Sequence, residues 1–273
     1  MSEPLQIVVC VKQVPDPESP PSSFTLDSSE MRVTCSGVPP VLSPFDENAL
    51  ELAIALKELH GAEVTIVSAG RGLSKAVLLK ALAVGADKIL VVDDEALARD
   101  KVDSRQTALV LASAISDNVE KYDLVLTGIQ AADTNAGQVG HLLGCKLGIP
   151  VLSLVRKVEL SDGAIRVERV LADGCEVVEA GLPVLLTVSH EVGELRYPSL
   201  AAIKAAKGLP QTTLSLADLG VDLGSEKSVD LVSLELPDRE RRCQMVEAEE
   251  PELAGAALAA RLVEDKKLTG FVR

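Results

Sequence analysis

The stretch DLVLTGIQAADTNAGQVGHLLGCKLGIP, residues 123–150, decides the fold. Its apolar run at 124–126 predicts a strand buried on both faces. The small and short polar residues of 128–135 predict a loop. A helix is expected over about 136–147, closed off by Pro150. Because this arrangement points free backbone N–H groups at the amino end of a helix, the stretch indicates a phosphate site.

The loop itself supports that interpretation. Connections from strand to helix usually run about 2–6 residues, and this one is longer and almost without bulky side chains. Asp133, Thr134 and Asn135 stand where the helix is expected to begin, so each can cap it or bind a ligand. Asp133 is the carboxylate that we single out as functional, and a plain helix cap is its alternative.

Composition excludes several classes of function. The net charge is −14 at pH 7, which argues against nucleic acid and against an anionic membrane surface. Aromatic residues make up 2% of the chain, and there is no Trp. A base or flavin therefore cannot be stacked on several aromatic side chains of this chain. Backbone, aliphatic side chains and a partner would have to hold it.

The five cysteines are widely spaced and form no C-x-x-C, which is typical of a reducing compartment and predicts no zinc site. With three histidines, no metal centre is expected. His141 and Cys145 are four residues apart, a spacing seen in metal sites, but no third ligand lies nearby in the sequence. The pair is therefore interpreted as packed or exposed. We find no signal peptide and no apolar run near the roughly 20 residues of a membrane span, so a cytoplasmic location is expected.

Strands and helices alternate from residue 5 to residue 154, which predicts a mostly parallel, doubly wound α/β sheet. Ser43 and Pro44 predict a helix start. Ligands of such sheets bind beyond the carboxyl ends of the strands. The loops at 10–14, 43–45, 69–72 and 128–140 are therefore expected to converge on one site.

After residue 150 the pattern changes. Residues 151–170 predict a hairpin that turns at 161–163, and 175–179 and 183–189 predict further strands; we expect all of these to extend the sheet antiparallel at an edge. A nucleotide-binding domain over 1–208 is predicted. Residues 209–273 are interpreted as an extended C-terminal arm, ending in a helix at about 251–264, that packs on a partner subunit.

No phosphate-loop, dinucleotide or nucleophile-elbow motif occurs, and nothing pairs a nucleophile with a base, so no catalytic residue is predicted. Any redox chemistry would belong to a bound cofactor. Arg71 could bind a phosphate or be a surface arginine. Tyr197, Leu200 and Ile203 form either an exposed docking patch or the underside of a packed helix.

Several motifs together resemble the β subunit of electron transfer flavoproteins. They are VCVKQVPD at 9–16, SPFD at 43–46, GIQAAD at 128–133 with QVG at 138–140, RYPSL at 196–200 and DLGV at 218–221. They occur in the family's order from about residue 7 to 222. The resemblance implies a heterodimer with an α subunit, which carries electrons from acyl-CoA-type dehydrogenases to a quinone reductase or another acceptor. It implies an electron carrier rather than an enzyme.

The resemblance also implies cofactors and sites. FAD would be shared with the α subunit, and this chain would bury AMP or a second FAD. Leu200 corresponds to the family's hydrophobic anchor for dehydrogenases, with Tyr197 and Ile203 beside it. The residues implied to bind the cofactor are Cys10, Ser43, Pro44, Phe45, Asp46, Ala69, Gly128, Gln130, Ala131, Asp133, Thr134, Asn135, Ala136, Gly137, Gln138 and Val139.

Two branches stay open. Electron-bifurcating members, which oxidise NADH on a second FAD, read Asp-Gly-Asp-Thr-Ala-Gln-Val-Gly where this chain has DTNAGQVG at 133–140. AMP-binding members show three Asp there, of which Asp133 remains. The broken bifurcating signature favours AMP, whereas KQVPD at 12–16 resembles the bifurcating branch. An alternative from another functional class is a stand-alone adenine-nucleotide sensor of the universal-stress type, which has a similar α/β arrangement. This alternative gives no role to the C-terminal arm.

Overall fold

The computed structural model describes residues 4–98, 101–161, 163–236, 243–246 and 250–265. The chain divides into two compact units, residues 1–234 and 235–273. The described part of the second unit contains helix α6 (Pro251–Glu264), where the sequence predicts a helix. None of the described helices is long and apolar enough to cross a membrane.

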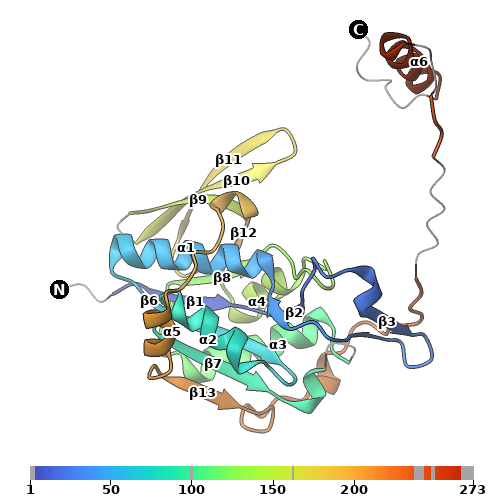
Figure 1. The fold of residues 1–273 in the computed structure, drawn as a ribbon. Helices are drawn as coiled ribbons and strands as arrows, with labels where there is room; N and C mark the ends of the chain where they lie inside the picture. The colour runs from blue at the N-terminus through green and yellow to red at the C-terminus, as the bar shows by residue number, and fades with distance from the viewer. Residues whose placement is uncertain (1–3, 99–100, 162, 237–242, 247–249, 266–273) are drawn as a thin grey trace. The chain divides into compact units, whose positions relative to one another are not determined.

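The first unit is built on a sheet of nine strands within the described residues (Figure 1). These strands are β1 (Gln6–Cys10), β6 (Glu63–Gly70), β7 (Lys88–Asp93), β8 (Leu124–Gly128), β9 (Val151–Ser161), β10 (Ala164–Leu171), β11 (Gly174–Gly181), β12 (Val184–Val188) and β13 (Gln211–Leu214). Their order is β11-β10-β9-β12-β8-β1-β6-β7-β13. All neighbours are parallel except β9–β10 and β10–β11, so the predicted mostly parallel sheet with an antiparallel hairpin at one edge is confirmed.

Helices cover both faces of the sheet. One hydrophobic core packs α1 (Pro44–His60), α2 (Lys75–Ala83) and α5 (Leu200–Ala206) on one face. A second core packs α3 (Ser104–Asn118) and α4 (Val139–Leu147) on the other. The doubly wound arrangement is therefore confirmed. Strands β8 and β12 are buried along their whole length, as apolar runs covered on both faces should be.

Short elements complete the unit. Two small antiparallel pairs join β2 (Gln13–Pro15) to β5 (Pro40–Leu42) and β3 (Phe24–Asp27) to β4 (Arg32–Cys35). The second pair is the small hairpin that the sequence predicts. Single 3-10 turns are η1 (Pro21–Ser23), η2 (Glu95–Leu97), η3 (His190–Val192) and η4 (Leu223–Glu226).

The order of the strands fixes where a ligand can bind. From β1 the chain continues to β6 and β7 on one side, and then returns to place β8 on the other side of β1. The carboxyl ends of β1 and β8 therefore flank the topological switch point, where open α/β sheets hold their ligands.

Two sequence expectations about the sheet differ from the structure. Residues 183–189 were expected to be antiparallel at an edge, but β12 lies between β8 and β9 and is parallel to both. Its five apolar or β-branched residues suit that buried place, and periodicity alone does not reveal strand order. Strand β13 pairs with β7, so the sheet extends past residue 208, where the arm was predicted to begin.

Candidate functional site

A cleft of about 1300 Å³ lies at the carboxyl ends of β1, β6 and β8. Cys10 lines it from the end of β1, Ala69 and Gly70 from β6, and Thr127 and Gly128 from β8. The cleft therefore lies at the switch point. Loops that are far apart in the sequence meet there as predicted, although residues 43–45 stand behind the wall.

Most of the residues predicted to bind a cofactor line this cleft. Those that line it are Cys10, Asp46, Ala69, Gly128, Gln130, Ala131, Thr134, Ala136, Gly137, Gln138 and Val139. Those outside the lining are Ser43, Pro44, Phe45, Asp133 and Asn135. Of the second group, Ser43 and Asp133 both contact Lys12, which lines the cleft.

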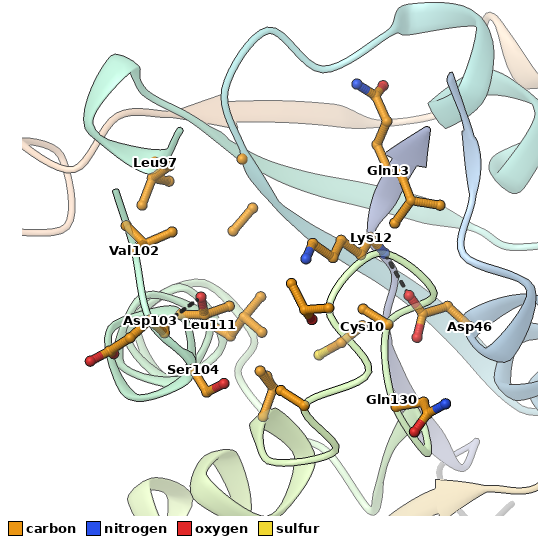
Figure 2. A pocket seen from close by; sticks show the side chains of 18 of the residues that line it. Cys10, Lys12, Gln13, Asp46, Leu97, Val102, Asp103, Ser104, Leu111 and Gln130 are labelled. Atoms are coloured by element: carbon orange, nitrogen blue, oxygen red, sulfur yellow. Dashed lines mark hydrogen bonds between the residues drawn. The ribbon is translucent and has the colours of Figure 1, made fainter. Parts of the chain in front are cut away.

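The first turn of α1 holds two cleft loops together. The Asp46 carboxylate is buried and accepts the N–H of Lys12 at 2.8 Å (Figure 2). It also accepts the N–H of Gly128 at 3.1 Å. Ser43 donates its N–H to the Lys12 carbonyl at 2.9 Å. The hydroxyl of Ser43, the residue before α1, does not cap the helix and instead accepts the N–H of Ala132 at 3.3 Å.

Two glycines allow the close approach of these elements. A Cβ on Gly128 would lie 2.6 Å from the backbone carbon of Phe45 and 2.7 Å from Asp46 Oδ1. A Cβ on Gly140 would lie 2.7 Å from Thr127 Oγ1. The first glycine therefore lets α1 reach β8, and the second lets α4 pack against the sheet.

Helix α4 begins three residues later than its predicted start, at Val139. Asp133, Thr134 and Asn135 therefore precede the helix and do not cap it. The Asp133 carboxylate binds Lys12 Nζ at 2.9 Å, and Asn135 has φ +50° and donates its N–H to the Ala131 carbonyl. Gln138 takes the N-cap position and no side chain caps the helix there. The amino end of α4 thus points uncapped backbone N–H groups towards the cleft.

Several other backbone donors near the cleft have protein acceptors. Asp93 accepts the N–H groups of Gly72 at 2.7 Å and Leu73 at 3.3 Å. Gln13 Oε1 accepts the N–H of Ser74, before α2, at 2.6 Å. Asp103 caps α3 in a capping box with Gln106. Of the helices whose first residue lines the cleft, α3 is capped by Asp103 and α4 has no side-chain cap, so the amino end of α4 is better suited to an anion.

The charged side chains lining the cleft are mainly cationic, although the whole chain is acidic. Among the described residues these cations are Lys12, Arg32, Arg71 and Arg105, and the carboxylates are Asp46 and Asp103. The cations are paired with carboxylates outside the lining, namely Asp133, Glu30, Glu95 and Glu226. This distribution suits an anion such as a phosphate.

Burial raises the pKa of two groups beside the end of β1, one on β1 and one on α1. Burial raises the pKa of Asp46 to about 7, although the N–H groups of Lys12 and Gly128 oppose the shift. Burial, together with the charge of Asp46, raises the pKa of the Cys10 thiol. Cys10 is therefore a neutral, unreactive thiol in the wall, whereas Asp46 gains or loses its proton near neutral pH.

Sequence reasoning missed the far wall of the cleft. Leu97, Val102 and Leu111 face the β1 end across the pocket, beside the capping residue Asp103 (Figure 2). Further along, Ser228 and Val229 also line the cleft, because their N–H groups bind the Asp103 carboxylate at 2.7 and 3.1 Å. The capping pattern Asp103–Gln106 was the available signal for this wall.

The predicted docking residues lie on α5 and in the loop before it. Tyr197 is 90% exposed and Leu200 is 87% exposed, whereas Ile203 is half-buried against the core. Arg196 fixes this loop on α1 through Glu51, with Nη2 and Oε1 2.7 Å apart, and through Glu58. The exposed pair Tyr197 and Leu200 thus stands on a rigid support.

Comparison with known proteins agrees with this geometry. A family model described as "Electron transfer flavoprotein domain" matches residues 31–219. The chain is 38% identical to the electron transfer flavoprotein subunit beta of Thermoanaerobacterium thermosaccharolyticum, over 87% of this chain and 90% of that protein. It is 37% identical to the subunit beta of Clostridium acetobutylicum, over 80% and 81% of the two chains.

A third relative is named as part of a larger assembly. The caffeyl-CoA reductase-Etf complex subunit CarD of Acetobacterium woodii is 36% identical, over 80% of this chain and 80% of its own. The family match covers more than half of the chain, and these relatives align over most of their length. The chain therefore belongs to the electron transfer flavoprotein family, as a β subunit.

Proposed function

We propose that this chain, with an α subunit, carries electrons from acyl-CoA-type dehydrogenases to a quinone reductase or another acceptor, and binds an adenine nucleotide in its cleft. One observation carries the nucleotide site: the uncapped amino end of α4 faces a cleft at the switch point whose charged lining is mainly cationic. Backbone N–H groups, a helix dipole and cations together bind phosphate.

The residues of the cleft fit such a ligand. Gly137 lies just before α4 and has no side chain that could cover the amino end of the helix. The described lining contains no aromatic residue, so Leu97, Val102 and Leu111 would hold the adenosine part by aliphatic contact. FAD bound with the α subunit would supply the one- and two-electron chemistry. This chain would hold its nucleotide and present a docking surface to partners.

The docking surface would be formed by Tyr197 and Leu200. Both are almost fully exposed, and large exposed apolar groups on a rigid support mark interaction sites. The relative CarD is named as a subunit of a complex with a reductase of a CoA ester. A dehydrogenase or reductase acting on CoA esters is therefore the partner class that we propose for this surface.

An electron-transfer assay tests the proposal. The chain is purified with the α subunit of the same organism, and a CoA-ester dehydrogenase of that organism is added with its substrate. We expect a yellow complex whose flavin is bleached at a rate that depends on the dehydrogenase. A complex that stays colourless after FAD is added, or a flavin that no such dehydrogenase reduces, would overturn the carrier function.

A second candidate is the electron-bifurcating branch, which is favoured by the size of the cleft. Its volume of about 1300 Å³ exceeds the roughly 300–1,000 Å³ of common ligand pockets, so it has room for a dinucleotide. In that case NADH would reduce the complex directly, and two flavins would be extracted per heterodimer. One flavin and one AMP per heterodimer would assign the chain to the simple carriers.

A further inference from the structure

The structure joins two walls of the cleft through one buried carboxylate. Asp46 accepts the N–H of Lys12, just after β1, on Oδ2 and the N–H of Gly128, at the end of β8, on Oδ1. Each oxygen therefore holds one of the two strand ends that flank the switch point. Asp46 lines the cleft beside these two strand ends, so it can act on the loops that would contact a ligand there.

We propose that Asp46 is a positioning residue whose ionised carboxylate sets the spacing of the Lys12 and Gly128 loops, so that nucleotide binding in the cleft is coupled to release of a proton from Asp46. This inference rests on the proposed nucleotide site. It adds to that site a form of regulation, in which the affinity for the nucleotide depends on pH near neutrality.

The chemistry of a carboxyl group explains the coupling. The ionised form accepts both N–H groups in charge-assisted hydrogen bonds, whereas in the protonated form one oxygen carries the proton and is a weaker acceptor. One strand end is then held less strongly, and a buried N–H with a weak acceptor is costly. Gly128 cannot move closer to compensate, since it already lies against the Phe45 backbone.

The titration falls in the physiological range. Burial raises the pKa of Asp46 to about 7. In the described residues, the other charged and titratable groups that face it are Cys10 and Lys12 from the β1 end and Asp133 from the loop after β8. Lys12 favours the ionised form of Asp46, whereas Asp133 and burial oppose it. As pH falls through 7, Asp46 gains its proton and its hydrogen bond to one of the two cleft loops weakens.

Asp123 provides a matched control at the other end of the same two strands. It precedes β8, and its carboxylate accepts the N–H of Gln6, the first residue of β1, at 2.8 Å. It therefore ties β1 to β8 far from the cleft. Asp123→Asn should affect stability without affecting the nucleotide site.

The test is calorimetric titration of AMP into the αβ complex, stripped of the nucleotide of this chain, at pH 6, 7 and 8. At pH 8 we expect Asp46→Asn to weaken AMP binding about tenfold, as loss of one well-placed hydrogen bond would. At pH 6 the wild type and the variant should agree within about twofold, because Asp46 is then largely protonated. Asp123→Asn should follow the wild type at every pH.

Proton release distinguishes positioning from a general loss of structure. At pH 7, in buffers of different ionisation enthalpy, wild type should release about half a proton more than Asp46→Asn on binding AMP. The measurement is repeated on the wild type alone with ADP-ribose, which has no group that titrates near pH 7. Proton release on binding ADP-ribose then comes from the protein, so the role of Asp46 can be tested even if the variant does not fold.

Each outcome has a defined meaning. Binding of AMP and ADP-ribose without this proton release, or an equal affinity of Asp46→Asn at pH 8, would overturn the role of Asp46 and leave the nucleotide site standing. A complex that binds neither compound would overturn the nucleotide site and this inference with it.

Discussion

Lys12 Nζ lies 2.9 Å from Asp133 Oδ1, and this ion pair joins the end of β1 to the loop after β8 across 121 positions of sequence. The Asp133 carboxylate is almost fully covered, with 3% of its side chain exposed, whereas Lys12 is 34% exposed and lines the cleft. Asp133 therefore holds a lysine towards the ligand space and does not itself line that space.

Lys12→Gln should weaken AMP binding by about tenfold at low salt, because the cleft loses a positioned cation near the expected phosphate. The salt dependence of binding should also become shallower, since one charge pair fewer is screened. Affinity of the αβ complex measured between 20 and 300 mM NaCl checks both effects.

Lys57→Gln is the matched control for Lys12. Lys57 pairs with Asp87 at 2.5 Å and is exposed to a similar extent, 28%, but it does not line the cleft. Equal losses of AMP affinity in the two variants would show that Lys12 acts through general charge and not through its place in the cleft.

Gly128→Ala should lower the free energy of unfolding by about 1–3 kcal/mol, the usual cost of overpacking a core. The added Cβ would meet the Phe45 backbone at 2.6 Å, which has no flexible side chain to move. Urea unfolding of the complex measures the change. Gly181→Ala, where nothing lies within 4 Å and φ is ordinary, should change stability by less than about 0.5 kcal/mol. Similar losses for both glycines would refute the close packing at Gly128.

Asp103 should make stability depend on acid pH. Burial alone would raise the pKa of Asp103, but hydrogen bonds from Gln106 N–H and from Ser228 lower it from 3.8 to about 2. A depressed pKa stabilises the folded protein above pH 4, and this contribution is lost as pH falls from about 4 to 2. After allowance for solvent screening it amounts to about 1 kcal/mol.

Asp103→Asn should remove that part of the pH dependence and retain a side chain that can cap α3. Chemical unfolding at pH 5 and pH 3 provides the measurement. A variant whose stability falls between these two pH values as steeply as that of the wild type would exclude Asp103 as the source.

Leu200→Ala should raise the KM of the complex for a CoA-ester dehydrogenase by about tenfold, because an exposed apolar anchor at an interface contributes about 1–2 kcal/mol. The flavin spectrum and the stability of the complex should not change, since Leu200 is 87% exposed. Leu171→Ala, an exposed leucine at the end of β10, is the control. An unchanged KM in Leu200→Ala would remove this residue from the docking surface.

Local patterns explain which parts of the fold could be predicted. The buried strand β8, the start of α1 at Pro44 and the hairpin of β9 and β10 each follow from composition and spacing within one segment. Strand β13 could not be found in this way, because the short polar sequence QTTL is a strand through its pairing with β7.

The candidate site also has parts that local sequence predicts and parts that depend on contacts between remote segments. The small-sided loop at 128–135 signals a ligand by its own sequence, and Gly128, Gln130, Ala131 and Thr134 of this loop line the cleft. The start of α4 was misplaced because Asp133 resembles a helix cap, although its true partner, Lys12, is remote in sequence. The role of Asp46 likewise depends on the two backbone groups brought to it by β1 and β8. Contacts of this kind appear once the chain has folded.

The central claim is that this chain binds an adenine nucleotide of its own, and the nucleotide content of the purified αβ complex tests it most directly. Acid extraction, chromatography and quantification against protein should give two adenine-containing compounds per heterodimer: one FAD with either AMP or a second FAD. A single FAD per heterodimer, with no further adenine compound retained and none bound on addition, would contradict the account.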